Sequence, residues 1–171
     1  GTSEKAPELK PSAATTGLNA VLLNIQQPIS SLGISHDGKR IAVGTGLYRA
    51  PGSVQLWDVA KREKIWQGEP FKFGVPAVAF SHDEKRIAAS NFSDSFLRLY
   101  DIENGKQIKE IRGHHRNIAG IAFSSNGKYF ATASLDKDIK LWDTSTNREV
   151  KTFSGHGDYV SSIAISPDSK H

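Results

Sequence analysis

The tripeptides Leu56-Trp57-Asp58, Leu99-Tyr100-Asp101 and Leu141-Trp142-Asp143 recur along this chain at intervals of 43 and 42 residues. A four-residue turn sequence keeps nearly the same spacing, because its copies begin at Ser35, Ser81, Ser124 and Ser166. Two independent markers thus share one period of about 40–45 residues. The chain is therefore built from an internal repeat, and each repeat is expected to form one structural unit.

Within each repeat, four short runs of alternating residues lie between turn-forming clusters, and this pattern is typical of β-strands. The first run of each repeat carries small residues on one face and large residues on the other. The small ones are Ser31, Gly33, Ala77, Ala79, Gly120, Ala122, Ser162 and Ala164, and the large ones are Leu32, Ile34, Val78, Phe80, Ile121, Phe123, Ile163 and Ile165. Such faces suit a sheet packed between two similar sheets. The fourth run is more polar, as expected of an outer edge.

The phased Trp-Asp dipeptides, the pairs Gly113-His114 and Gly155-His156, and the Ser-containing turns together resemble the WD-repeat family over residues 18–171. The resemblance implies an all-β chain of β-propeller blades. We expect three full four-stranded blades at about residues 28–71, 72–113 and 114–155, and a partial fourth at 156–171. A propeller of this kind closes with about four to eight blades, so the chain is expected to be part of a larger ring.

The two ends of the chain give further expectations. Residues 1–17 are rich in Pro, Ala, Ser, Thr, Glu and Lys, which predicts a disordered leader or a linker introduced by cloning. Residues 20–24 stand where the outer strand of a preceding blade would lie. The fourth unit is predicted to supply one inner strand at 159–166. Association with another copy or a complementing chain would bury the exposed faces beside Leu32 and Ile163.

Composition limits the possible functions. The chain has 171 residues, 37% of them hydrophobic, and a net charge of +4, with no run long enough to span a membrane. It has no cysteine, so a disulfide, a thiolate metal site and a cysteine nucleophile are excluded. The mild basic excess indicates a solvated surface before a nucleic-acid footprint. The compartment stays open, with the cytoplasm favoured over export.

His114, Thr132, Asp136 and Trp142 stand where the WD-repeat family has a hydrogen-bonded network, so the resemblance implies a structural role for them. A Ser/Thr-His-Asp catalytic triad is the alternative. It is disfavoured because Thr132 lacks the strained exposed turn of an activated nucleophile. In the second repeat, Ser90 and Asp94 are assigned to the same network, Phe71 replaces the histidine and Tyr100 replaces the tryptophan. The first repeat keeps Trp57 but lacks the aspartate.

Two other groups of residues invite a chemical interpretation. His36 and His82 lie in turns one period apart, which places them on neighbouring blades rather than around one ion, so no metal site is predicted. His114, His115 and Arg116, with Arg112 and Lys109, form the densest basic cluster. That cluster is interpreted as a solvated rim, because no series of stacking aromatics accompanies it. No cofactor and no catalytic residue are predicted.

The loop at residues 44–52 is three or four residues longer than its counterparts, and it carries Tyr48 and Arg49. Tyr and Arg are favoured at protein interfaces. In the WD-repeat family this loop opens on the face most often used for partners. The corresponding candidates are Tyr48, Arg49, Phe92, Ser93, Arg116, Leu135 and Tyr159. A loop that only tolerates an insertion is an equally open alternative.

The sequence therefore predicts a non-catalytic scaffold that presents a loop face to a peptide or protein partner of unknown identity. Two alternatives from other classes remain. A basic propeller associated with nucleic acid is suggested by the isoelectric point near 9.3. A propeller-based enzyme is disfavoured because no acid, base and nucleophile stand out as a set.

Overall fold

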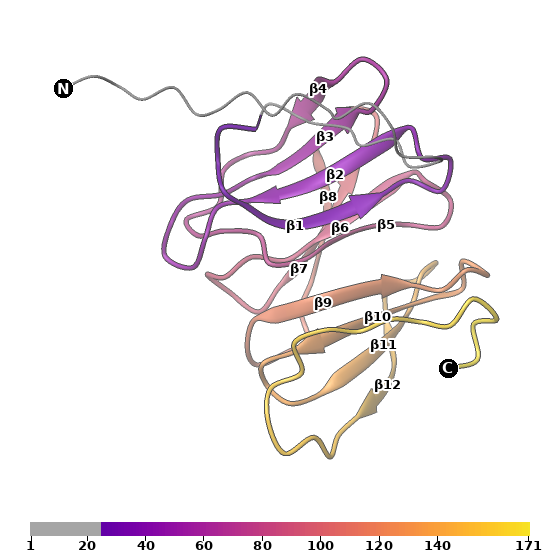
Figure 1. Cartoon of the computed structure of the whole chain (residues 1–171). Coiled ribbons are helices and arrows are strands. Elements are labelled where there is room, and N and C mark those ends of the chain that lie inside the picture. Colours follow the sequence, from indigo (N-terminus) through magenta and orange to yellow (C-terminus); the bar gives the residue numbers. More distant parts are fainter. Residues whose placement is uncertain (1–24) are drawn as a thin grey trace, which may run out of the picture.

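The computed structural model describes residues 25–171, and these form twelve β-strands arranged as three four-stranded antiparallel sheets (Figure 1). In each sheet the strands follow the order of the chain. The first sheet contains β1 (Ile29–Ile34), β2 (Arg40–Thr45), β3 (Val54–Asp58) and β4 (Glu63–Gln67). The second contains β5 (Val78–Phe80), β6 (Arg86–Ala89), β7 (Leu97–Asp101) and β8 (Gln107–Ile111). The third contains β9 (Ile118–Phe123), β10 (Tyr129–Ser134), β11 (Ile139–Asp143) and β12 (Glu149–Phe153).

We call these sheets blades 1, 2 and 3. The blade boundaries given above stay a prediction, and the predicted leader and the segment 20–24 lie outside the described residues. No helix in the part of the chain that is described is long and apolar enough to cross a membrane.

The turn between the first two strands of each blade repeats one set of hydrogen bonds. In blade 1, Ser35 Oγ donates to Asp37 Oδ1 over 2.7 Å, and the amide of Lys39 donates to the same oxygen over 3.0 Å. Gly38 follows with a φ of 69°, a left-handed conformation that glycine adopts at no steric cost. Asp83 and Asn126 accept equivalent bonds in blades 2 and 3. The repeated turn sequence thus fixes the same hairpin three times.

The inner strands β1, β5 and β9 lie beside one another, and their faces bring the blades together (Figure 1). One hydrophobic cluster joins Leu56 and Ala42 of blade 1 to Phe80 of blade 2. A second cluster joins Leu99 of blade 2 to Phe130 of blade 3. The core therefore lies between blades, and the expectation that a blade packs between two similar sheets is confirmed for blade 2.

Small residues face the neighbouring blade, as predicted. A Cβ on Gly33 would lie 3.4 Å from the carbonyl oxygen of Val78, so this strand approaches blade 2 at backbone distance. The opposite face of β1 carries Leu32 and Ile34, which are 59% and 67% exposed. Ser31 Oγ also donates to the carbonyl of Val75 over 2.7 Å. The small face of β1 therefore packs on blade 2, and the bulky face of β5, with Val78 and Phe80, packs back on blade 1, while the bulky face of β1 is exposed.

The predicted inner strand at 159–166 is not observed, because no strand is assigned after Phe153. The segment runs past β9, where a Cβ on Gly120 would lie 3.1 Å from the Cα of Ser162. This contact joins the faces of two units, whereas a strand is defined by hydrogen bonds along its edge. Its turn is nevertheless formed, since Ser166 Oγ donates to Asp168 Oδ1 over 2.5 Å. The fourth unit is therefore an extended segment with a formed turn.

The burial of the repeated aromatic residue gives a test of the blade assignment. Trp142 is 3% exposed and stacks on Phe130, with ring centroids 5.9 Å apart, whereas Tyr48 is 61% exposed on a loop. We expect Trp142→Ala to lower the free energy of unfolding by about 3–5 kcal/mol, because the substitution empties a packed site. Tyr48→Ala is expected to cost about 0.5 kcal/mol, as exposed substitutions usually do. Urea denaturation measures both, and equal losses would contradict the assignment.

Candidate functional site

The long loop between β2 and β3 is held by backbone hydrogen bonds to the chain that enters blade 2. Gly52 and Phe71 exchange both of their amide-to-carbonyl bonds, at 3.3 and 2.7 Å. The amide of Gly74 donates to the carbonyl of Leu47 over 3.0 Å. The three segments meet so closely that a Cβ on Gly52 would overlap the carbonyl oxygen of Thr45. We call this arrangement the glycine clamp, and it fixes the loop at its base.

Above the clamp, the loop displays Tyr48 and Arg49 on an aromatic platform. The Tyr48 ring meets Phe92 edge to face at 5.7 Å and lies 6.2 Å from Phe73. The guanidinium of Arg49 lies 5.4 Å from the centre of the Tyr48 ring. Arg49 itself has a φ of 68°, which is uncommon for a residue with a side chain. The structure thus brings three predicted residues, Tyr48, Arg49 and Phe92, together with Phe73.

Phe73 was missed in the sequence, although a signal for it exists. It stands two residues after Phe71 and immediately before Gly74, where the backbone of the long loop comes too close for a Cβ. Lys72 between them places its ammonium 5.5 Å from the centre of the Phe73 ring. An aromatic-glycine sequence at the entry to a blade is therefore informative about the loop face.

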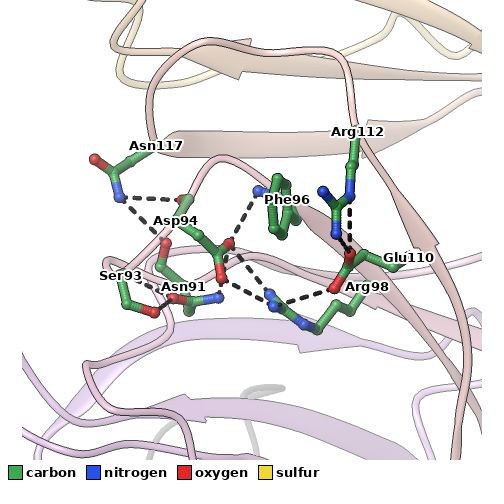
Figure 2. A network of polar contacts seen from close by, with 8 residues as sticks. All are labelled: Asn91, Ser93, Asp94, Phe96, Arg98, Glu110, Arg112 and Asn117. Atoms are coloured by element: carbon green, nitrogen blue, oxygen red, sulfur yellow. Dashed lines mark hydrogen bonds and ion pairs between the residues drawn. The ribbon is translucent and has the colours of Figure 1, made fainter.

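The next loop, residues 91–96, is shaped by a network around Asp94 (Figure 2). Asp94 accepts bonds from both terminal nitrogens of Arg98, at 3.2 and 2.9 Å, and from the amide of Phe96 at 2.9 Å. Burial alone would raise the pKa of Asp94, but these donors outweigh it and lower the pKa below its ordinary value. Asn117 of blade 3 donates to the carbonyl of Asp94 over 3.2 Å and so ties the loop to the next blade.

Ser93, a predicted contact residue, belongs to the same network. Its amide donates to Asn91 Oδ1 over 2.7 Å, and its hydroxyl donates to the same oxygen. Phe92 and Ser93 also line a hollow of about 310 Å³ that extends to Arg116. This hollow connects the loop of blade 2 to the connection between blades 2 and 3.

The remaining predicted residues surround a second hollow, of about 540 Å³. Leu135, Arg116 and Tyr159 line it, together with Asp136 and Lys137. Arg116 donates to the hydroxyl of Tyr159 over 3.1 Å, and its guanidinium lies 5.8 Å from the centre of that ring. Arg116 lines both hollows, so all seven predicted contact residues lie along one continuous surface. We call this surface the loop face.

Behind the second hollow, the four predicted network residues are joined in one chain of hydrogen bonds. Trp142 Nε1 donates to Thr132 Oγ1 over 2.9 Å, and Thr132 Oγ1 lies 2.7 Å from His114 Nε2. His114 Nδ1 lies 2.8 Å from Asp136 Oδ2. The chain is satisfied when His114 is neutral and carries its proton on Nδ1, because Nε2 can then accept the hydroxyl proton of Thr132.

The charge state of the network follows from the same geometry. Burial lowers the pKa of His114 and outweighs the opposing effect of Asp136. The pKa of Asp136 is also lowered, because bonds from the amide of His115 and from His114 outweigh the effect of burial. Thr132 is fully buried and already accepts a bond from Trp142. A nucleophile needs access to a substrate, so this arrangement does not favour the catalytic interpretation.

Blade 2 carries different residues at the positions that correspond to this network. Ala89 pairs with Arg98 as Thr132 pairs with Lys140, so Ala89 occupies the register position of Thr132. The assignment of Ser90 to a network of this kind was wrong by one residue. Because successive side chains alternate across a sheet, Ser90 points the other way, and its hydroxyl donates to the carbonyl of Ile118 in blade 3.

Arg98 has the register position of Lys140 in blade 3, and it makes the polar contacts in this part of blade 2. Its guanidinium lies 5.2 Å from the centre of the Phe71 ring, and it pairs with Glu110 at 3.3 Å in addition to Asp94. Tyr100 replaces the tryptophan and stacks on Trp66, and burial raises the pKa of Tyr100 to about 12. Blade 2 is thus stabilised by an ion-pair network that the sequence did not reveal, because its members come from three separate segments.

The other groups singled out in the sequence lie elsewhere. His36 and His82 meet edge to face at 5.1 Å on the turns of neighbouring blades, at the end opposite the loop face. Within residues 25–171, no three potential metal ligands of the His, Cys, Asp or Glu type converge. Of the basic cluster, Arg112 pairs with Glu110 at 2.8 Å and lies over Phe96. Only His115 and Arg116 of that cluster line the hollows.

Four-stranded antiparallel blades packed face to face through their inner strands define the chain as a run of β-propeller blades built from repeats. The family model for the WD domain, G-beta repeat, matches residues 61–101, 105–143 and 147–171, more than half of the chain. The chain belongs to the WD40 repeat family. Each of the first two matched segments runs from the outer strand of one blade to the third strand of the next. The sequence repeat is therefore offset from the blade by one strand. Each of these repeats supplies the outer strand of one blade and the first three strands of the next.

The chain is similar to larger proteins of this kind. It is 27% identical over 115 residues to Protein FIZZY-RELATED 1 of Arabidopsis thaliana, which covers 67% of this chain and 23% of that protein. It is 28% identical over 128 residues to the anaphase-promoting complex subunit cdh1 of Dictyostelium discoideum, covering 72% and 16%. The crystal structure of the RRP9 WD40 repeats superposes with a TM-score of 0.75 at 23% identity, covering 85% of this chain and 44% of that one. The chain thus spans less than half the length of these relatives.

The glycine clamp predicts a steric effect at Gly52. We expect Gly52→Ala to lower the free energy of unfolding by about 1–3 kcal/mol, because the new methyl group would meet the backbone on both sides. The matched control is Gly157→Ala, since a Cβ there would have no neighbour within 4 Å. Urea denaturation of both variants measures the difference. If the two substitutions have the same effect, the loop is not held as described.

The His114 network predicts a pH dependence of stability. The pKa of His114 is lower in the folded chain than its ordinary value near 6.5. As the pH falls, His114 is therefore protonated in the unfolded chain before it is protonated in the folded chain. Stability is therefore expected to fall as the pH drops from about 6.5 towards the pKa of the folded state. Removal of this titration in His114→Gln should make the decline between pH 8 and pH 5.5 smaller. It should also cost about 1–3 kcal/mol at pH 8, because Thr132 and Asp136 lose a partner.

Urea denaturation at the two pH values measures this dependence, and His156→Gln, which removes an exposed imidazole, is the matched control. A decline in His114→Gln as steep as in the unaltered chain would show that His114 does not cause it.

Proposed function

We propose that the chain is a non-catalytic scaffold whose loop face binds a peptide or a domain of another protein. The observation that carries this proposal is the combination of the glycine clamp with the exposed side chains above it. Tyr48 is 61% exposed on a loop whose base is fixed by backbone hydrogen bonds to blade 2. A loop fixed in this way loses little entropy when a partner binds. A loop that only tolerates an insertion has no need of such a clamp.

The composition of the loop face supports the same proposal. Its exposed residues combine aromatic rings with arginine, the residue types that carry most binding energy at protein interfaces. The two hollows lie beside these residues and offer room for partner side chains. One relative carries the description of a subunit of the anaphase-promoting complex, and a role in an assembly fits a scaffold.

The alternatives have less support. For an enzyme, the His114 network would have to act on a substrate, yet its hydroxyl is buried and its hydrogen bonds are satisfied internally. For nucleic-acid binding, the isoelectric point near 9.3 is the favouring observation. Such binding weakens steeply as salt rises, because counterions are released from the phosphates. Retention on heparin at low salt and its loss with added salt would favour this second function.

The proposal is tested with a random peptide library displayed on phage and selected against the unaltered chain. Binding of the selected peptides is then measured with the double variant Tyr48→Ala/Arg49→Ala. We expect an affinity loss of about 30-fold or more, as for the loss of a central interface residue. The matched control is Ile108→Ala, which removes an apolar side chain that is 51% exposed on the outer strand of blade 2. Selected peptides that bind both variants as tightly as the unaltered chain would overturn the proposal.

A further inference from the structure

The cations of the loop face share one arrangement. Arg49 lies over Tyr48, Lys72 lies over Phe73 and Arg116 lies over Tyr159, with the charge 5.4, 5.5 and 5.8 Å from the ring centre. Each charge is carried by an exposed side chain next to a ring that is partly exposed itself. The loop face therefore presents three units of one cation and one aromatic ring.

These three cations have no carboxylate partner. Among residues 25–171, no ion pair within 4 Å includes Arg49, Lys72 or Arg116. The turns at the other end of the blades differ, because Arg40 there pairs with Glu84 at 2.8 Å and Lys39 lies 3.7 Å from Asp37. The sequence thus supplies counter-charges at one end of the blades and leaves the loop face with unpaired positive charge.

The carboxylates of Asp94, Asp136 and Asp158, which lie close to this surface, accept hydrogen bonds from other groups of the chain. Asp94 is bound by Arg98, and Asp136 is bound by His114 and by the amide of His115. Asp158, which lines the second hollow, accepts the amide of Tyr159 over 2.7 Å. Because Arg98 is a cation, Asp94 opposes an anionic ligand less than a free carboxylate would. Asp136 and Asp158 keep their negative charges, since their donors are a neutral imidazole and backbone amides.

The three units lie along one path. Tyr48 contacts Phe73 and Phe92, Phe92 lines the first hollow, and Arg116 joins that hollow to the one lined by Tyr159. The cations are distributed along this path rather than gathered at one point. A single dianion such as a phosphate is bound best by cations that converge on it. Cations spread along a path instead match several single negative charges on an extended chain.

We propose that the loop face binds an acidic, extended peptide segment of a partner protein, with Asp or Glu side chains on Arg49, Lys72 and Arg116. Apolar side chains of the same segment pack on the rings of Tyr48, Phe92 and Tyr159. A guanidinium can hold a carboxylate through two parallel hydrogen bonds, and the ring beside it adds apolar contact area. The inference rests on the proposed function and names the class of partner for the same surface.

The experiment uses the 171-residue chain and a fluorescent 12-residue peptide in which Glu and Asp alternate with Leu and Phe. The change in fluorescence anisotropy gives the dissociation constant. We expect binding by this peptide and at least tenfold weaker binding by the matched peptide with Gln and Asn in place of the acids. We also expect Arg49→Ala and Arg116→Ala each to weaken binding about tenfold, since each removes a hydrogen-bonded charge pair.

The matched control variant is Lys39→Ala, which removes one positive charge at the opposite end of the blades. It should leave the dissociation constant unchanged, whereas a loss equal to that of Arg116→Ala would show that net charge alone is responsible. Thermal denaturation of each variant establishes that it is folded. The conservative variant Arg116→Lys should keep part of the affinity, because it retains the charge and loses the second hydrogen bond.

Three results would overturn the inference. The first is equal binding of the acidic and the amide peptide. The second is tighter binding of a peptide with one phosphoserine and no other acid, which would indicate a convergent phosphate site. The third is tighter binding of a 12-nucleotide oligouridylate that competes with the peptide. If instead the selected library peptides depend on Tyr48 but are not acidic, the inference fails and the proposed function stands. If no selected peptide depends on Tyr48, the proposed function fails.

Discussion

Close approach between the backbones of neighbouring blades is the constraint on which this structure depends. A Cβ on Gly44 would lie 2.6 Å from the carbonyl oxygen of Val75, and one on Gly120 would lie 3.1 Å from Ser162. Small residues at these positions allow the inner strand of one blade to lie against the next, where hydroxyls such as that of Ser31 bond to the neighbouring backbone. The bulky faces then fill the remaining space, so burial is concentrated between blades.

The same register position in the three blades carries three different residues, and the polar chemistry changes with it. Thr132 in blade 3 joins a histidine, an aspartate and a tryptophan. Ala89 in blade 2 cannot donate or accept there, and Arg98 makes the polar contacts instead. In blade 1 the position is Val43, and Trp57 Nε1 donates to Gln55 Oε1 over 2.9 Å. Buried polar groups need partners, and each blade satisfies this requirement with its own residues.

Much of the fold could be predicted because the same strand and turn motifs recur in each repeat. Two Trp-Asp dipeptides, their counterpart Tyr100-Asp101 and four turns define the strands. The alternation of Gly33 with Leu32 and Ile34 indicates the packing of the faces. Features that occur once were harder to predict. The register of Ser90 was misplaced by one residue, and the contacts of Arg98 with Phe71 and Glu110 join segments far apart in the sequence. No periodic pattern encodes such contacts.

The loop face shows how packing between blades also shapes the surface offered to a partner. The clamp at Gly52 and Gly74 uses the same absence of a Cβ that lets the inner strands approach one another. Because Gly74 lies between Phe73 and the start of blade 2, the position of the aromatic platform depends on how blades 1 and 2 pack. Asn117 makes a similar link, since it bonds to the loop of blade 2 from the first residues of blade 3. A substitution that loosens the contact between two blades therefore also displaces the loops above that contact, although it touches none of the exposed side chains.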